Sequence, residues 1–356
     1  MTANVQPVRF PMPRRQNGAL PSALIKAYPE DWQVTEIYDR GFREEGEHAY
    51  LYVEKRCLST IPVAQWLSER FQIPLIDVGY AGMKDKYALT RQWFSVRQPG
   101  LAGRLDVQEL MLNQGDEQIK VLASHRHHRK LRRGEHQGNR FRITLREPDS
   151  AIDCQALPKQ IQAGFPNYFG PQRFGRHNLG DALAWLRHRR RRKVSQQVRG
   201  WHLSVLRSWI FNQLLADRVT DGTWQEVLEG DVLTPCSSSG GEVPAGPLWG
   251  RGRETLSGEA LRRQQQTLAA SALADSGLAR NLNDPETMSL GEVCEALEYA
   301  GVDRGQRPLA VVPWDVQCER ATSAVTLSFS LPVGAYATVM LANHFDLQDK
   351  SVEHRL

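Results

Sequence analysis

The spacing of apolar residues predicts strands near both ends of the chain. Residues 33–37 and 50–54 alternate between apolar and polar side chains, which is the period of a strand with one buried face. The glycine-containing segment 41–47 lies between them, and a hairpin across it would pair the two strands. Residues 324–331 alternate in the same way. These patterns therefore predict that both ends of the chain contribute strands to a sheet.

The segment 140–146 gives the clearest strand pattern. Its faces differ in chemistry: one is apolar, with Phe141, Ile143 and Leu145, and the other is polar, with Arg140, Arg142, Thr144 and Arg146. Such a strand can contribute core packing from one face and substrate contacts from the other.

Helical spacing dominates the middle of the chain. Helices are predicted at 61–71 behind a Ser59-Thr60 cap, and at 201–215, 258–275, 290–300 and 336–345. The segment 234–252 is rich in Ser, Gly and Pro and predicts loops. Strand-rich ends around a helix-rich middle indicate one sheet domain that is interrupted by an inserted domain.

Composition narrows the class of protein. The chain has 356 residues, which favours two domains, and its 41% hydrophobic and 24% charged residues are ordinary for a globular protein. We expect no membrane span and no secretory signal, because the apolar runs are too short. The cysteines, which form no C-x-x-C pair, predict neither a disulfide framework nor a structural zinc site and fit a reducing cytoplasm; they are Cys57, Cys154, Cys236, Cys294 and Cys318.

Two basic clusters predict a polyanionic partner. Eight Arg and Lys residues lie within 126–146 against the single acid Glu135, and a second cluster spans 187–193. Such clusters attract nucleic acid through counterion release, although a solvated helix face is the alternative for either cluster alone.

Common catalytic and cofactor motifs are absent. No P-loop, G-x-G-x-x-G fingerprint or G-x-S-x-G elbow occurs. The histidines within 125–136 are interleaved with Arg and Lys, so phosphate contact is favoured over a metal site.

The segment 79–96 contains the strongest candidate for chemistry. Asp85 stands between Lys84 and Lys86 behind the small residues Ala81 and Gly82, and an apolar run follows. Cations near a carboxylate favour its ionised form, which a nucleophile or general base needs. A solvated surface turn is the alternative reading of the same residues. Aromatic residues near the basic segments add the possibility of a pocket for an unstacked base.

Five motifs resemble the TruD-type tRNA pseudouridine synthases along nearly the whole chain. They are Lys26-Ala27-Tyr28-Pro29-Glu30-Asp31-Trp32, Ala81-Gly82-Met83-Lys84-Asp85-Lys86, the segment from Arg132-Arg133-Gly134 through Gly138-Asn139-Arg140-Phe141, Pro166-Asn167-Tyr168-Phe169-Gly170-Pro171-Gln172-Arg173-Phe174-Gly175, and Leu331-Pro332-Val333-Gly334-Ala335-Tyr336-Ala337-Thr338.

The resemblance implies a reaction and a set of site residues. It implies isomerisation of a tRNA uridine, typically uridine-13, to pseudouridine without cofactor or metal. Asp85 matches the catalytic carboxylate, which attacks ribose C1′ or acts as the glycosidic bond breaks, and Lys26 matches its ion-pair partner. Lys84 and Lys86 are then candidates for phosphate contacts. The matched base-contacting positions are Asn139, Phe141, Trp32 and Tyr336, the last two where many members carry phenylalanine.

The resemblance also implies an architecture. We expect an α+β pseudouridine synthase domain with a mixed, mostly antiparallel sheet, formed by residues 1–154 and 306–356. Residues 155–305 would form an inserted, helix-rich α/β TRUD domain, with a basic cleft between the two. We expect a cytoplasmic monomer that binds tRNA. Two alternatives stay open: a tRNA-binding or tRNA-folding protein without activity, and an RNA-cleaving enzyme that uses His127 or His136.

Overall fold

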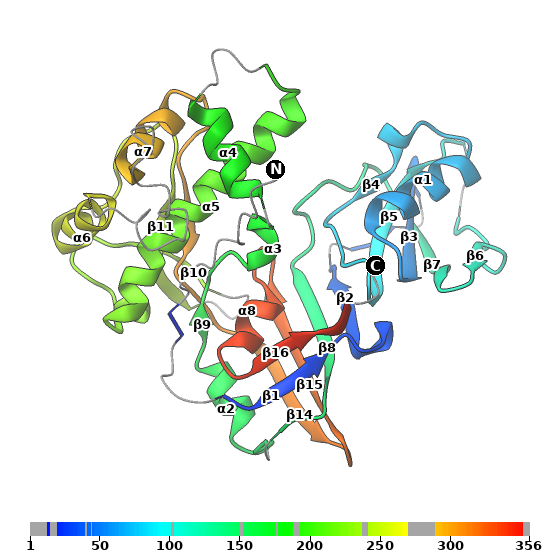
Figure 1. Cartoon of the computed structure of the whole chain (residues 1–356). Coiled ribbons are helices and arrows are strands. Elements are labelled where there is room, and N and C mark those ends of the chain that lie inside the picture. Colours follow the sequence, from blue (N-terminus) through cyan, green and yellow to red (C-terminus); the bar gives the residue numbers. More distant parts are fainter. Residues whose placement is uncertain are drawn as a thin grey trace, which may run out of the picture. The chain divides into compact units, whose positions relative to one another are not determined.

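The chain forms two compact units, each assembled from segments distant in sequence (Figure 1). The computed structural model describes residues 13–14, 20–39, 41–43, 45–100, 103–149, 152–175, 177–187, 193–236, 241–269 and 289–351. The sheet unit holds the described residues within Ala19–Ala163, Pro313–Gly334 and His344–Leu356. The helical unit holds those within Met1–Gly18, Gly164–Val312 and Ala335–Asn343. The expected domain boundaries after residues 154 and 305 stay a prediction.

One sheet of 11 strands forms the sheet unit, with the central path β14-β15-β8-β2-β5-β3-β7-β6. Its elements are β1 (Ser22–Ile25), η1 (Pro29–Asp31), β2 (Trp32–Ile37), β3 (His48–Arg56), α1 (Thr60–Arg70), η2 (Leu75–Asp77), β4 (Gly79–Tyr80), β5 (Leu89–Arg97), β6 (Met111–Gln114), β7 (Glu117–His127), β8 (Gly138–Arg146), α2 (Leu157–Gln162), β14 (Trp314–Arg320), β15 (Ala324–Pro332) and β16 (Asp346–Asp349). Only the pairs β2–β5 and β1–β16 are parallel among the described strands. The predicted mixed, mostly antiparallel sheet is confirmed.

The predicted hairpin between the first two alternating segments is wrong. Strand β5 lies between β2 and β3, parallel to the first and antiparallel to the second. Residues 92–96 of β5 are all buried, so both faces of this strand are covered. A strand buried on both faces belongs inside a sheet rather than at its edge, and it therefore separates the two half-buried strands.

The two-faced pattern of residues 140–146 is confirmed in β8. Phe141, Ile143 and Leu145 are buried, whereas Arg140 and Arg142 are exposed. β8 pairs with β15 on one side and with β2 on the other. Since directly paired residues of antiparallel strands point to the same face, the register sets which β2 and β8 side chains meet.

Helix α1 packs its apolar stripe on the sheet beside β3 and β5, which Figure 1 shows next to it. Val63, Ala64 and Leu67 are fully buried in one cluster with Leu51 and Phe94. The helix starts at Thr60, close to the predicted start, but the side chain of the N-cap residue makes no capping hydrogen bond.

The helical unit is built around α5, a helix of 25 residues that contains the predicted segment 201–215. Its elements are β9 (Phe165–Pro166), α3 (Pro171–Phe174), α4 (Asn178–Arg187), α5 (Gln196–Thr220), η3 (Thr223–Gln225), β10 (Val232–Pro235), β11 (Glu242–Leu248), α6 (Gly258–Ala269), α7 (Leu290–Glu298), β12 (Gly305–Pro308), β13 (Ala310–Val311) and α8 (Ala337–Ala342). The loop prediction for 234–252 is wrong in part, because β10 and β11 pair there despite their prolines. The prediction of helix over 270–275 and the cluster at 188–192 lie outside the described residues.

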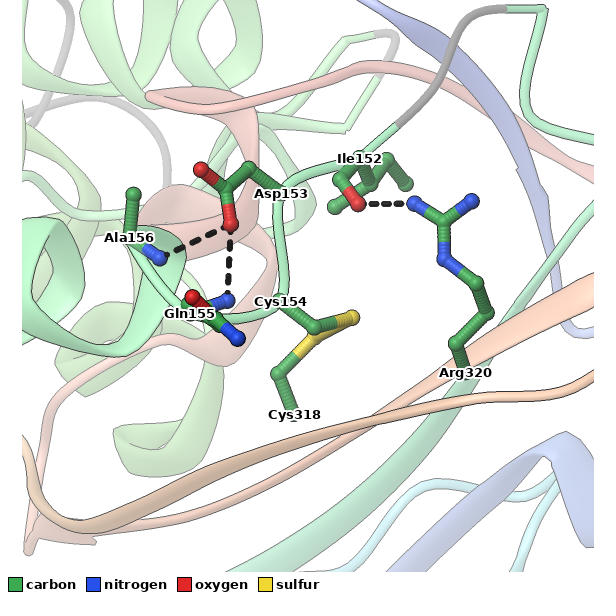
Figure 2. The surroundings of a disulfide bond; sticks show 7 residues. All are labelled: Ile152, Asp153, Cys154, Gln155, Ala156, Cys318 and Arg320. Carbon is green, nitrogen blue, oxygen red and sulfur yellow. Dashed lines mark hydrogen bonds between the residues drawn. A yellow bond between two sulfur atoms is a disulfide. The ribbon is translucent and has the colours of Figure 1, made fainter.

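The prediction of no disulfide is wrong for one pair of cysteines. Cys154 and Cys318 are bonded within the sheet unit, with a Cα–Cα distance of 5.1 Å (Figure 2). Next to them, Asp153 Oδ1 accepts hydrogen bonds from the backbone N–H groups of Gln155 and Ala156. The two cysteines are 164 residues apart, and spacing along the sequence gives no sign that α2 packs beside β14.

Candidate active site

The loop Ala81–Lys86 connects β4 to β5 and is fixed by three buried side chains from three elements. Lys55 Nζ on β3 donates to the Asp85 carbonyl oxygen at 2.7 Å. Thr60 Oγ1, at the start of α1, accepts from the Lys84 N–H at 2.9 Å. Gln92 Nε2 on β5 donates to the Gly82 carbonyl oxygen at 3.0 Å. The loop is therefore held through its backbone, and its carboxylate stays available.

The Asp85 carboxylate meets two partners from the first motif. Trp32 Nε1 donates to Asp85 Oδ2 at 2.8 Å. Lys26 Nζ lies 4.0 Å from the same oxygen and 4.4 Å from the centre of the Trp32 ring. The Asp85 side chain is 36% exposed, whereas that of Lys26 is 5% exposed. An accessible carboxylate thus faces a buried cation and accepts a hydrogen bond from an indole N–H.

The backbone of Lys26 lies in the left-handed region, with φ of +55°. This conformation is unfavourable for a residue with a side chain and costs roughly 1–3 kcal/mol. Lys26 is the first residue after β1, and in this strained conformation its ammonium group lies beside Asp85.

The two lysines that flank Asp85 differ in their surroundings. Lys84 Nζ donates to Glu36 Oε2 at 2.8 Å, and the two side chains are 3% and 0% exposed. Glu36 Oε1 also accepts from the Trp93 N–H at 3.1 Å. Lys86 is 68% exposed, with its nearest carboxylate at 4.0 Å. The expectation of a phosphate contact is therefore wrong for Lys84, which is used to hold the loop, and stays a prediction for Lys86.

His136 and Gly82 pack closely beside the Lys84 ammonium. A Cβ atom added at Gly82 would lie 3.0 Å from His136 Cε1 and 3.3 Å from Lys84 Nζ, so a side chain at this position would have to displace both groups slightly. Burial, together with the Lys84 charge, lowers the pKa of His136 to about 4. His136 is thus neutral at pH 7.

Asn139 and Phe141 share the sheet face that carries Trp32 and Glu36. In the β2–β8 register Asn139 lies opposite Glu36, and Phe141 lies opposite Val34. The Phe141 ring stacks on Phe329 at 5.3 Å and meets the Trp32 ring edge-on at 6.5 Å.

Three residues of the sheet unit are expected to contact the base, namely Asn139, Trp32 and Phe141, and they differ in what they could offer it. Asn139 Oδ1 is buried and has no hydrogen-bond partner among the described residues. Trp32 is 1% exposed and Phe141 8% exposed, so neither ring presents a free face.

Tyr336 belongs to the helical unit, and its expected role stays a prediction. Its ring lies 6.1 Å from that of Phe169, in an edge-on arrangement. A Cβ atom at Gly170 would lie 3.2 Å from the Tyr336 ring. The glycine of the fourth motif thus gives this ring the space to pack within its own unit.

Lys55 and Glu36 support the loop, and neither was predicted as a site residue. Burial lowers the pKa of Lys55 from 10.5 to about 7. A signal for both residues was present in the sequence: Lys55 follows the buried Leu51 and Val53 at a spacing of two, and Glu36 follows Val34. A charged residue at an inward position of a strand needs a partner, so the alternation itself marks such residues.

The basic residues within 126–146 are only partly available to a ligand. Arg126 is fully buried and donates to the carbonyl oxygens of Gly103 and Gln98. Arg146 forms a two-pronged hydrogen bond with Asp31, at 2.8 and 2.9 Å. If this cluster binds a polyanion as predicted, the contacts must come from its exposed basic residues.

Across the described residues, no three His, Cys, Asp or Glu side chains converge as a metal site requires. None of the described helices has both the length and the apolar character needed to cross a membrane.

The family model described as tRNA pseudouridine synthase D (TruD) matches residues 21–184 and 188–344. The chain belongs to the TruD family. Its relatives include the tRNA pseudouridine synthase D of Methylococcus capsulatus, 37% identical over 93% of each chain, and that of Pseudomonas entomophila, 36% identical over 94% of each chain.

A solved structure supports the fold of this TruD family member. A Methanosarcina mazei protein described as a tRNA pseudouridine synthase D superposes with a TM-score of 0.67, covering 93% of this chain and 95% of that one. The two are 20% identical in sequence, so they share the fold although most of their residues differ. The predicted α+β synthase fold is confirmed.

Proposed function

We propose that the protein isomerises uridine to pseudouridine in tRNA, with Asp85 as the catalytic carboxylate and uridine-13 as the target. The family supports the reaction, and one observation supports the residue: Asp85 is a partly exposed carboxylate on a loop fixed through its backbone. Glu36, an acid that contacts this loop through Lys84, is fully buried in that ion pair.

Uridine and pseudouridine contain the same atoms, so the reaction only rearranges bonds. The N1–C1′ glycosidic bond breaks, uracil rotates, a C5–C1′ bond forms, C5 loses its proton and N1 gains one. Asp85 acts on C1′ as a nucleophile or stabilises the positive charge that develops there. The Trp32 N–H holds Asp85 Oδ2 in place, and Lys26 supplies the opposite charge. Because an isomerisation balances within the substrate, no cofactor or metal enters the proposal.

A uridine must leave its stack to bring C1′ to Asp85, so the proposal includes a flipped base. Asn139 is the candidate for reading the uracil edge, because an amide can donate and accept and its Oδ1 is buried without a partner among the described residues. Phe141 and Trp32 would wall the pocket with their edges rather than stack face to face. Tyr336 stays a candidate for base contact through the resemblance. We further propose that the enzyme acts as a monomer in the cytoplasm.

The test uses the full chain and unmodified tRNA transcripts. We expect chemical mapping to detect pseudouridine at position 13 and to lose the signal in a transcript with cytidine there. A tRNA-folding protein would leave uridine unchanged, and a nuclease would shorten the RNA. Either outcome would overturn the proposal, whereas pseudouridine at another position would overturn only the choice of target.

A further inference from the structure

A groove of about 430 Å³ lies within the sheet unit, next to the loop Ala81–Lys86, which we call the catalytic loop, and no role described above uses this groove. Its walls come from α1, from η2 and β4, and from the segment 130–133 that follows β7. The volume falls within the roughly 300–1,000 Å³ of sites for small ligands. We call it the η2 groove.

One wall of the η2 groove exposes apolar surface. Ile76 is 79% exposed and Leu75 is 45% exposed, and they are adjacent in η2. A single exposed apolar residue needs no explanation, but two together at the mouth of a groove indicate a surface that a ligand covers.

A second wall carries an aromatic ring paired with a cation. Arg133 Nη2 donates to the Tyr80 hydroxyl at 2.9 Å, and its guanidinium carbon lies 5.2 Å from the centre of the ring. Both a planar guanidinium and a tyrosine ring can stack against a nucleobase. This pair therefore supplies a stacking surface.

Positive charge lines the same wall. Lys130, Arg132 and Arg133 all line the groove. Among the described residues, none of these three side chains forms an ion pair with a carboxylate; Lys130 instead donates to the Ile76 carbonyl oxygen. A groove with an aromatic–cation pair, apolar residues and cations that form no side-chain ion pair among the described residues complements a nucleotide, whose base is flat and apolar and whose phosphate is anionic.

The η2 groove is also adjacent along the chain to the candidate active site. Tyr80 ends β4, and the catalytic loop begins at the next residue. Asp85 follows Tyr80 by five positions, so their Cα atoms are at most roughly 18 Å apart. The Gly134 N–H donates to the Ala81 carbonyl oxygen at 2.8 Å, which ties the basic segment to the loop. One RNA molecule can therefore reach both places.

We propose that the η2 groove binds an unpaired nucleotide of the tRNA other than the target uridine. Its base stacks on the Tyr80–Arg133 pair against Ile76, and its phosphate lies at Arg132 and Lys130. The inference rests on the proposed function, because it takes tRNA as the substrate. A second anchored nucleotide would fix the direction in which the strand passes Asp85.

The test compares tRNA binding and turnover for substitutions inside and outside the groove. For the double variant R132Q/R133Q we expect KM for tRNA to rise about 10-fold and kcat to stay within about 2-fold. The slope of log Kd against log salt should fall by about 0.7, since each phosphate contact to single-stranded RNA contributes about 0.7 and Arg132 is the phosphate contact that this variant removes. Arg97→Gln, a neutralisation of an exposed arginine outside the groove, is the matched control and should change neither.

A scan with abasic nucleotides then identifies the base. One abasic position outside the target should weaken binding to the unsubstituted protein at least 5-fold, and the same substitution should have little further effect in Tyr80→Leu. Tyr80→Phe keeps the ring and should retain that sensitivity, which separates stacking from a folding defect.

Two results would overturn the inference while leaving the proposed function intact: normal KM and salt slope in R132Q/R133Q, or no abasic position coupled to Tyr80. Both are read against a protein that forms pseudouridine in the unsubstituted tRNA. If the unsubstituted protein forms none, the proposed function itself fails.

Discussion

The two lysines beside Asp85 should respond very differently to the same substitution. Lys84→Met removes the cation from a buried pair and leaves the Glu36 carboxylate fully buried without it. Breaking a buried ion pair from one side costs about 3–5 kcal/mol. Lys86→Met removes an exposed charge at 4.0 Å from Glu117, where an ion pair contributes about 0–1 kcal/mol. The expected difference between the two variants is at least about 2 kcal/mol.

Hydrogen exchange detected by mass spectrometry measures this difference locally, which matters because the chain has two compact units. In Lys84→Met, amides of β2 and of the loop Ala81–Lys86 should exchange at least about 100-fold faster, since 1.36 kcal/mol corresponds to a factor of ten. Lys86→Met should change them less than about 5-fold. Adding Glu36→Gln to Lys84→Met should restore part of the protection, because the buried charge is then gone. Equal protection in the two single variants would refute the assignment of Lys84 as the internal support of the loop.

Three further substitutions test the surroundings of Asp85. Trp32→Phe keeps an aromatic ring but removes the N–H that binds Asp85 Oδ2, and steady-state assays should show kcat falling about 10-fold with KM little changed; an unchanged kcat would contradict the positioning role. Lys55→Met leaves the Asp85 carbonyl without its buried donor, so kcat should fall and loop amides should exchange faster, while Lys120→Met, an exposed lysine of the neighbouring β7, should change neither. The pKa of His136 is lowered to about 4 in the folded protein, so as the pH falls the unfolded chain takes up a proton on this histidine before the folded protein does. The free energy of unfolding therefore decreases as the pH falls from about 6.5 to 4. His136→Gln should make the urea-unfolding midpoint depend less on pH over that range, and an unaltered pH dependence would argue against a neutral buried histidine.

Periodicity predicted those features that depend on one element alone. The alternation within 140–146 correctly gave the two faces of β8, and apolar spacing correctly located α1 and most of α5. In each case the burial of a side chain depends on its position within its own strand or helix. Such patterns carry no information about which element lies next in the sheet, and the hairpin prediction failed for this reason.

Local sequence could not separate the roles of the residues around Asp85. Lys84 and Lys86 are equivalent as flanking cations, and only the packing of the loop against Glu36 distinguishes them. The Cys154–Cys318 bond likewise depends on β14 lying beside α2, far away in sequence. Asp85 and Lys26 were identified through the family resemblance, and the structure brings their charged groups to 4.0 Å.

The central claim is that the Asp85 carboxylate performs the chemistry. Asp85→Asn is a suitable perturbation because the amide oxygen can still accept from Trp32, and the loop is held through its backbone by Lys55, Thr60 and Gln92. Asp106→Asn, the same change at an exposed aspartate, serves as the control.

The decisive measurement is single-turnover formation of pseudouridine in tRNA with saturating enzyme, alongside the Kd for the same tRNA. We predict that Asp85→Asn binds tRNA within about 3-fold of the unsubstituted protein while the rate falls at least about 1,000-fold, and that Asp106→Asn changes neither. Near-normal pseudouridine formation by Asp85→Asn would contradict the account.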